Sequence, residues 1–204
     1  MCPETFESDM ATDGEITCFL KKWNKGDPKA LEALLEQVYL ELKQVARGVM
    51  SGERTDRTLS PTALVNEVYI RFINADRMRV ENRSQFFWFI GRLMRRVLVD
   101  HARSRQAVRR GSGVSDISLE KVHDLAGPCG LNPATLLALD QALNALKSFD
   151  ERQCRIVEMR YFAGLNLAEI SELTGLSEPT IKREWRTARA WLGQRLRSEQ
   201  AVMV

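Results

Sequence analysis

The most constraining feature of the sequence lies near its C-terminus, where two short helical patterns flank a glycine. Asn166 is a favourable helix N-cap, and Glu169, three residues later, completes a capping-box pattern. Gly175 can adopt positive φ without steric cost, which suits a turn. Ser177 can cap a second helix that has Pro179 in its first turn. Two short helices joined in this way predict a helix-turn-helix.

The second of these helices combines an apolar stripe with a basic surface. Apolar residues recur three or four positions apart and predict one buried face, made of Ile181, Trp185, Ala188, Leu192 and Leu196. The start of such a helix reaches base edges in DNA, so the candidate DNA contacts are Thr180, Lys182, Arg183 and Arg186. Arg183 suits a bidentate contact to guanine, whereas Thr180 and Lys182 suit phosphates. The alternative is a helical hairpin with a solvated basic face.

Helical spacing dominates the rest of the chain. Helical spacing predicts helices over 16–25 and 84–105. Cap-and-proline pairs or a single cap predict helices over 28–50, 61–73, 134–147 and 150–159, with loops at 51–59 and 74–83. Residues 106–132 contain glycine and proline without sustained periodicity. We therefore expect an all-α fold of two helical domains, 15–105 and 133–198, joined by a flexible linker over 106–132.

Positive charge is concentrated in two blocks, although the chain as a whole carries only +3. Residues 82–110 hold eight arginines and one aspartate, a net charge of +7. Residues 178–197 hold six Lys or Arg and two Glu, a net charge of +4, which leaves −8 for the rest. Two basic blocks in an otherwise acidic chain indicate two surfaces that contact a polyanion.

The first block interleaves aromatic and basic residues. Phe86, Phe87, Trp88 and Phe89 precede a series of arginines, of which Arg92, Arg95, Arg96 and Arg103 are candidate DNA contacts, together with Trp88. Arginines neutralise phosphates, and aromatic faces stack on unpaired bases at about 1–3 kcal/mol per base. This combination suits a protein that holds a melted strand. The alternative is that the aromatic side chains belong to the core. From helical geometry we expect about two of the four to be buried, and Phe86 and Phe89 have the spacing of residues on one buried face.

Other kinds of site find little support. The four cysteines form no CxxC pair and the two histidines have no metal-ligand spacing, so we expect no metal and no cofactor. Asp100-His101 is an acid–histidine neighbour pair, but adjacent helical residues point about 100° apart, so we expect no enzyme. The absence of a secretory signal or a long apolar run predicts a cytoplasmic protein without membrane contact.

Taken in order, these motifs resemble a bacterial RNA polymerase sigma factor of the extracytoplasmic-function (ECF) type over about 16–197. Residues 64–71, Leu-Val-Asn-Glu-Val-Tyr-Ile-Arg, resemble region 2.2. Residues 86–105 resemble regions 2.3 and 2.4, which melt and read the minus-ten element. Residues 134–196 resemble region 4, which reads the minus-thirty-five element. The chain departs from the usual family residues at Phe89, Arg96, Arg183-Glu184 and Thr187. These departures bear on which promoter sequence is recognised, and not on the role that the resemblance implies.

The resemblance implies two partners, which are promoter DNA and core RNA polymerase, the latter through its β′ clamp helices and β flap. An anti-sigma factor is a further partner that the resemblance allows. The candidate polymerase contacts are Asn66, Glu67, Ile70 and Arg71, whereas Leu64, Val68 and Phe72 should be core. The alternative is a stand-alone helix-turn-helix regulator whose N-terminal half senses a signal or dimerises. The aromatic and arginine block argues against it, because a sensor has no use for a single-strand platform.

Overall fold

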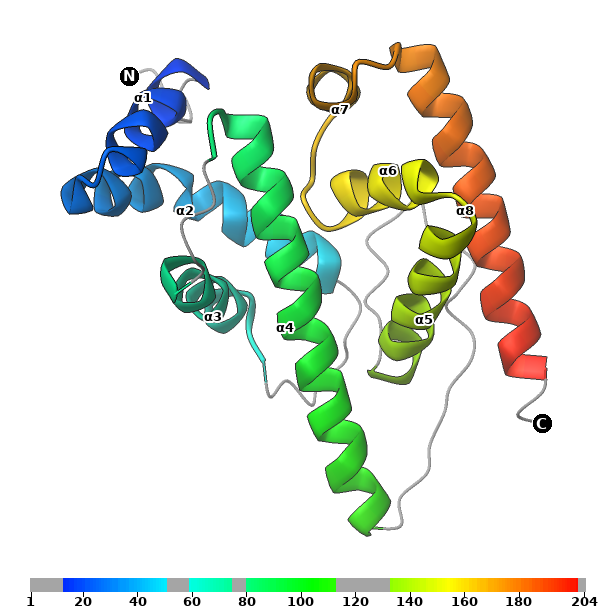
Figure 1. The fold of residues 1–204 in the computed structure, drawn as a ribbon. Coiled ribbons are helices and arrows are strands. Elements are labelled where there is room, and N and C mark those ends of the chain that lie inside the picture. The colour runs from blue at the N-terminus through cyan, green and yellow to red at the C-terminus, as the bar shows by residue number, and fades with distance from the viewer. Residues whose placement is uncertain (1–12, 51–58, 75–79, 113–132, 202–204) are drawn as a thin grey trace, which may run out of the picture.

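The computed structural model describes residues 13–50, 59–74, 80–112 and 133–201, and every regular element in these ranges is a helix (Figure 1). The all-α prediction is therefore confirmed for the described residues. The helices are α1 (Asp13–Asn24), α2 (Pro28–Met50), α3 (Pro61–Asn74), α4 (Arg83–Ser112), α5 (Pro133–Phe149), α6 (Glu151–Tyr161), α7 (Leu167–Thr174) and α8 (Glu178–Ala201).

The predicted helix starts rest on local hydrogen bonds that the structure contains. The Lys29 amide donates to the Asp27 carboxylate at 3.0 Å before α2. The Ala63 amide donates to the Ser60 hydroxyl at 3.1 Å before α3. Asp150 caps α6 in the same way by accepting from the Gln153 amide at 3.0 Å. These short polar side chains satisfy amides that have no partner within the helix.

Helix α4 is longer than the sequence pattern predicted. It continues to Ser112, seven residues past Arg105, where we expected the helix to end. The rest of the expected linker, 113–132, lies outside the described residues, as do 51–58 and 75–79 of the expected loops. So does Asn132, the residue expected to cap the helix over 134–147. The division into two domains stays a prediction.

Helix α4 lies at the centre of the fold (Figure 1). On one side α4 packs against α1 and α3, and both of these helices also contact α2. On the other side α4 packs against α5, α6 and α7. A single apolar cluster runs through both sides, from Ile16 on α1 to Leu196 on α8. Among the described residues no helix has both the length and the apolar character that a membrane crossing needs.

Candidate nucleic-acid and partner interfaces

Helices α7 and α8 form the predicted helix-turn-helix. The Glu169 amide donates to Asn166 Oδ1 at 3.0 Å, and the Asn166 amide donates to Glu169 Oε2 at 2.7 Å, so both halves of the capping box are present. Gly175 ends α7 with φ of 69°, and its amide donates to the Ser171 carbonyl at 2.8 Å. The left-handed conformation explains why a glycine stands there.

Helix α8 presents basic residues to solvent, and four of the five residues predicted for its apolar face are buried. Ile181, Ala188, Leu192 and Leu196 are buried, and Trp185 is half-buried beneath the guanidinium of Arg160. Lys182, Arg183 and Arg186 are exposed, whereas Thr180 is half-buried and its hydroxyl lies 2.9 Å from that of Ser177. The Arg183 side chain, 71% exposed, reaches Glu184 at 3.4 Å. This face is therefore open to a ligand.

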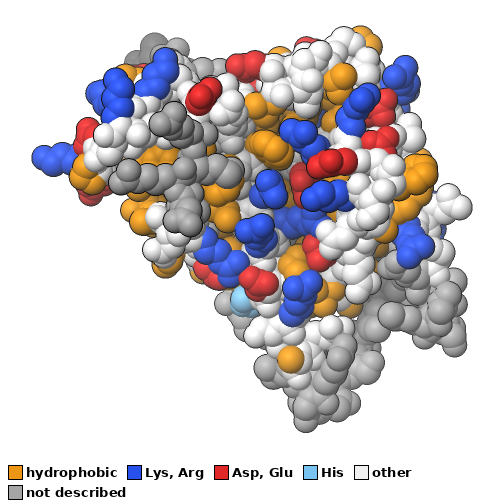
Figure 2. Space-filling model, viewed as in Figure 1, with side chains coloured by type: hydrophobic (Ala, Val, Ile, Leu, Met, Phe, Trp, Pro, Cys, Tyr) orange, Lys and Arg blue, Asp and Glu red, His pale blue; other side chains and the backbone are white. Residues whose placement is uncertain are grey.

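The candidate DNA contacts on α4 divide into two kinds. Arg92, Arg96 and Arg103 are exposed, but Arg95 is only 9% exposed. In Figure 2, Lys and Arg side chains gather at the centre of the visible face, over α4 and its border with α5 and α6, with acidic side chains among them. A pocket of about 340 Å³ lies along this border and is lined by all four arginines.

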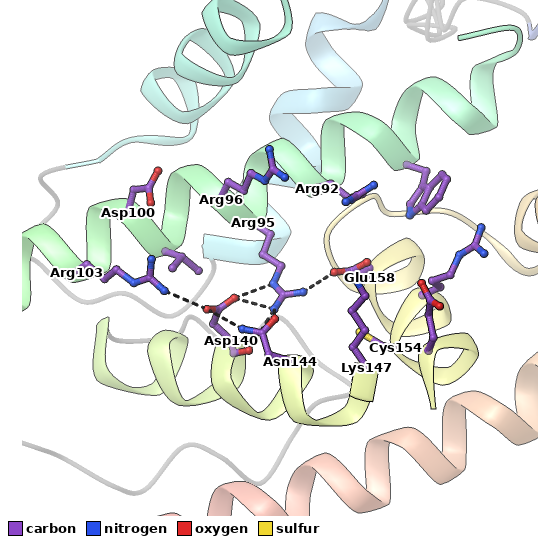
Figure 3. A pocket seen from close by; sticks show the side chains of 14 residues that line it. Arg92, Arg95, Arg96, Asp100, Arg103, Asp140, Asn144, Lys147, Cys154 and Glu158 are labelled. Atoms are coloured by element: carbon purple, nitrogen blue, oxygen red, sulfur yellow. Dashed lines mark hydrogen bonds and ion pairs between the residues drawn. The ribbon is translucent and has the colours of Figure 1, made fainter. Parts of the chain in front are cut away.

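Arg95 is held by α5 and α6 (Figure 3). Its Nε and Nη2 atoms donate to Asp140 Oδ1 at 3.0 and 2.7 Å. Nη2 also donates to Asn144 Oδ1 at 3.0 Å, and Nη1 donates to Glu158. Arg103 lies 3.6 Å from the second Asp140 oxygen. A guanidinium with partners on all three nitrogens is already satisfied in this arrangement.

The aromatic run is split between core and surface. Phe86 and Phe87 are buried, so the expected number of two buried rings is confirmed. The second buried ring is Phe87, however, whereas Phe89, which we expected in the core, is half-buried. Trp88 is half-buried, and its ring lies 5.8 Å from the Arg92 guanidinium and 4.9 Å from that of Arg155 on α6. Its indole Nε1 is buried and has no acceptor among the described residues.

The four candidate polymerase contacts lie along α3, and Leu64, Val68 and Phe72 are buried as predicted. Asn66 and Ile70 are exposed, with 57% of Ile70 accessible. Glu67 and Arg71 are half-buried and form an ion pair at 2.9 Å. Arg71 also donates to Asp100 of α4 at 2.8 Å, and this hydrogen bond, with that to Glu67, raises the pKa of the guanidinium. Arg71 thus joins α3 to α4.

An apolar groove beside these residues was missed by the sequence analysis. It lies between α2 and α3, has a volume of about 440 Å³, and is lined by residues that include Tyr39, Tyr69 and Val65. Leu40, Ile70 and Ile73 are exposed on the same two helices. The groove could not be read from the pattern because it depends on how α2 and α3 pack.

The remaining candidates for metal binding and reactivity are the His, Cys, Asp and Glu side chains. Within the described ranges, no cluster has three or more of them placed to hold a metal ion. Cys154 is buried, and its Sγ lies 3.4 Å from the Leu143 carbonyl. Burial raises the pKa of this thiol to about 11, with a further contribution from the nearby Glu158 carboxylate. The thiol is therefore protonated at neutral pH.

Comparisons with known proteins agree with this architecture. The family model of the ECF sigma factors matches residues 13–198, which include every helical segment described above apart from the end of α8. A search of curated proteins finds no match.

Proposed function

Because this chain belongs to the ECF sigma factor family, we propose that it binds core RNA polymerase and directs it to promoters through minus-ten and minus-thirty-five elements. Sigma factors act in transcription initiation, with RNA polymerase and promoter DNA as partners. One observation supports the assignment of the two promoter elements most directly. The basic residues at the start of α8 are exposed, and the α7 helix before them has both its capping box and its glycine turn. That geometry supports major-groove reading of the minus-thirty-five element.

The minus-ten element is assigned to α4. Arg92, Arg96 and Arg103 are exposed on one helix, at spacings that let them follow a phosphate backbone. Trp88 lies one turn before Arg92 and supplies a ring on which an unpaired base can stack. The melted strand would then run along this helix.

Core polymerase is assigned to α3 and its groove with α2. Ile70 and Tyr69 expose apolar surface beside the polar Asn66, a mixed face that suits a protein partner. The Arg71 link to Asp100 makes α3 and α4 one unit, so a partner bound to α3 would position α4. An anti-sigma factor that covers the α3 face would compete with the polymerase.

Run-off transcription with purified core polymerase and a promoter library tests the proposal. The chain should convert core polymerase into an enzyme that starts from a defined subset of templates. A stand-alone regulator would instead shift specific duplex DNA without polymerase and leave initiation by core unchanged. That second result would overturn the proposal.

A further inference from the structure

The pocket along the border of α4 with α5 and α6 is lined by cationic side chains that have no counter-charge. We infer that it binds a small free anion that carries two or more phosphate groups. Its volume of about 340 Å³ lies at the lower end of the range of small-molecule sites. The inference goes beyond the proposed function and does not rest on it, because a free phosphate anion is a different ligand from promoter DNA.

Most of the acidic side chains in the pocket already have a partner (Figure 3). Asp140 and Glu158 both bind the Arg95 guanidinium, which uses all three of its nitrogens in these contacts and one to Asn144. Asp100 accepts a hydrogen bond from Arg71 of α3. These carboxylates are therefore not available to neutralise further cations.

Four other cations line the same pocket from three helices. Arg92 and Arg96 belong to α4, Lys147 to α5 and Arg155 to α6, and the side chains of all four are exposed. None of them forms an ion pair within the part of the chain that the structure describes. Among the described lining residues, Glu151 is the single acidic side chain left to oppose them, so the pocket keeps an excess of positive charge.

Two of these cations meet at one aromatic ring. The Arg155 guanidinium lies 4.9 Å from the centre of the Trp88 ring, and that of Arg92 lies 5.8 Å from it. A ring face attracts a cation but does not neutralise it, so the two like charges still repel each other. The buried Nε1–H of Trp88 has no acceptor among the described residues either. The unmatched groups are thus donors and positive charges, which an anion with several oxygens would satisfy.

The number and kind of these groups favour linked phosphates over a carboxylate. Guanidinium groups bind phosphate oxygens through paired N–H donors, and an ammonium group binds them as a point charge. One phosphate group carries a charge of about −1.5 to −2 at pH 7, so two linked groups approach the excess charge of the pocket, whereas a single carboxylate does not. Because Arg92 and Arg96 are also assigned to the melted strand, the bound anion would compete with that strand for them.

Isothermal titration calorimetry of the free full-length protein tests the site, at fixed ionic strength and without divalent metal ions. The probes are inorganic pyrophosphate and GTP, and wild type should bind at least one of them at a single site with a Kd below about 1 mM. Arg155→Ala and Lys147→Ala should each weaken binding by roughly 10-fold, since each removes a charged donor from the pocket.

The matched control is Arg152→Ala, which removes an exposed arginine from the same helix as Arg155 but outside the pocket lining. It changes the net charge of the protein by the same amount and should bind like the wild type. Circular dichroism melts establish that each variant is folded.

The two probes also identify which part of the ligand is recognised. If GTP binds roughly 10-fold more tightly than pyrophosphate, the base contributes as well, and the neighbouring Trp88 ring is the group on which it can stack. If the two bind equally tightly, the phosphate groups alone are recognised. Both results support an anion site.

Three results would overturn the inference. The first is that neither probe binds more tightly than about 1 mM. The second is that folded Arg155→Ala and Lys147→Ala bind like the wild type. The third is that a single-stranded oligonucleotide binds while neither small anion does, because the cations would then serve nucleic acid alone. Run-off transcription judges the proposed function separately, since the calorimetry needs neither polymerase nor a promoter.

Discussion

Arg95 of α4 and Asp140 of α5 are joined by two hydrogen bonds to a single carboxylate oxygen, at 3.0 Å from Nε and 2.7 Å from Nη2. Their side chains are only 11% and 12% exposed. A charged pair with so little water around it is strongly coupled, since each partner without the other would lose its principal counter-charge. This pair connects the helix assigned to DNA melting with the C-terminal helices.

A double-mutant cycle on this pair should show the coupling. Arg95→Ala and Asp140→Ala together should destabilise the protein less than the sum of the single changes, with a coupling of about 1 kcal/mol or more in the free energy of unfolding. Urea titrations followed by circular dichroism measure it. The control cycle uses Arg96, which is exposed on the same helix and should show a coupling with Asp140 below about 0.5 kcal/mol. Equal values in the two cycles would contradict the assigned pair.

The exposed arginines of α4 should contribute to the salt dependence of promoter binding. Replacing Arg92 or Arg96 by Ala should reduce the slope of log K against log salt by roughly 0.7–0.9 for each phosphate that the variant no longer neutralises. Filter binding by the polymerase complex over a salt series measures the slope. Arg152→Ala removes an exposed arginine from α6 and is the matched control. If all three variants keep the wild-type slope, α4 does not bind phosphates.

Ile70 should contribute to polymerase binding without contributing to stability. Ile70→Asp places a charge on a side chain that is 57% exposed, so the free energy of unfolding should change by less than about 0.5 kcal/mol. The affinity for core polymerase should fall by roughly 10-fold or more, because a charge would be buried in the interface. Asn74→Asp adds the same charge at the exposed last residue of α3. Co-purification with core that is equally strong for both variants would contradict the α3 assignment.

Cys154 should be almost unreactive in the folded protein. Because burial raises its pKa to about 11, thiolate is scarce at neutral pH and alkylation should accelerate as the pH rises toward that value. At pH 8, iodoacetamide should modify Cys154 roughly 100-fold more slowly than a thiol of ordinary pKa. Cys18, which is exposed, is the comparison within the same protein. Peptide mass mapping measures both rates, and in urea, where the protein is unfolded, the two rates should become similar. Equal rates in the native protein would mean that Cys154 is accessible.

Local signals explain how much of the fold was predictable. The starts of α2, α3, α6 and α7 follow from capping side chains that act within three residues, so the sequence contains the whole interaction. The end of α4 was predicted too early, because residues 106–112 are mostly polar and lack the apolar repeat by which a helix is recognised.

The burial of Arg95 could not be predicted in the same way. Its partners Asp140 and Glu158 lie 45 and 63 residues along the chain, and nothing in the arginine block distinguishes Arg95 from Arg96 without them. The only indication was the net negative charge outside the two basic blocks, which gives the sign of the partners but not their positions. The prediction that Phe89 and not Phe87 is buried was wrong for a similar reason. The helices that pack on both sides of α4 decide which ring is enclosed.

The most direct test of promoter recognition by this chain is the base preference that Arg183 gives to the polymerase. Arg183 is exposed at the start of α8, where its planar set of donors can contact a guanine. Run-off transcripts from a promoter library should be sequenced for wild type and Arg183→Ala, with Lys182→Ala as the phosphate-binding control.

Wild-type start sites should share two sequence elements. Arg183→Ala should relax one position of the upstream element at a cost of about 1–3 kcal/mol, while Lys182→Ala weakens all templates alike. A wild-type library without an upstream element, or an Arg183→Ala variant that weakens every template equally, would contradict base reading by α8.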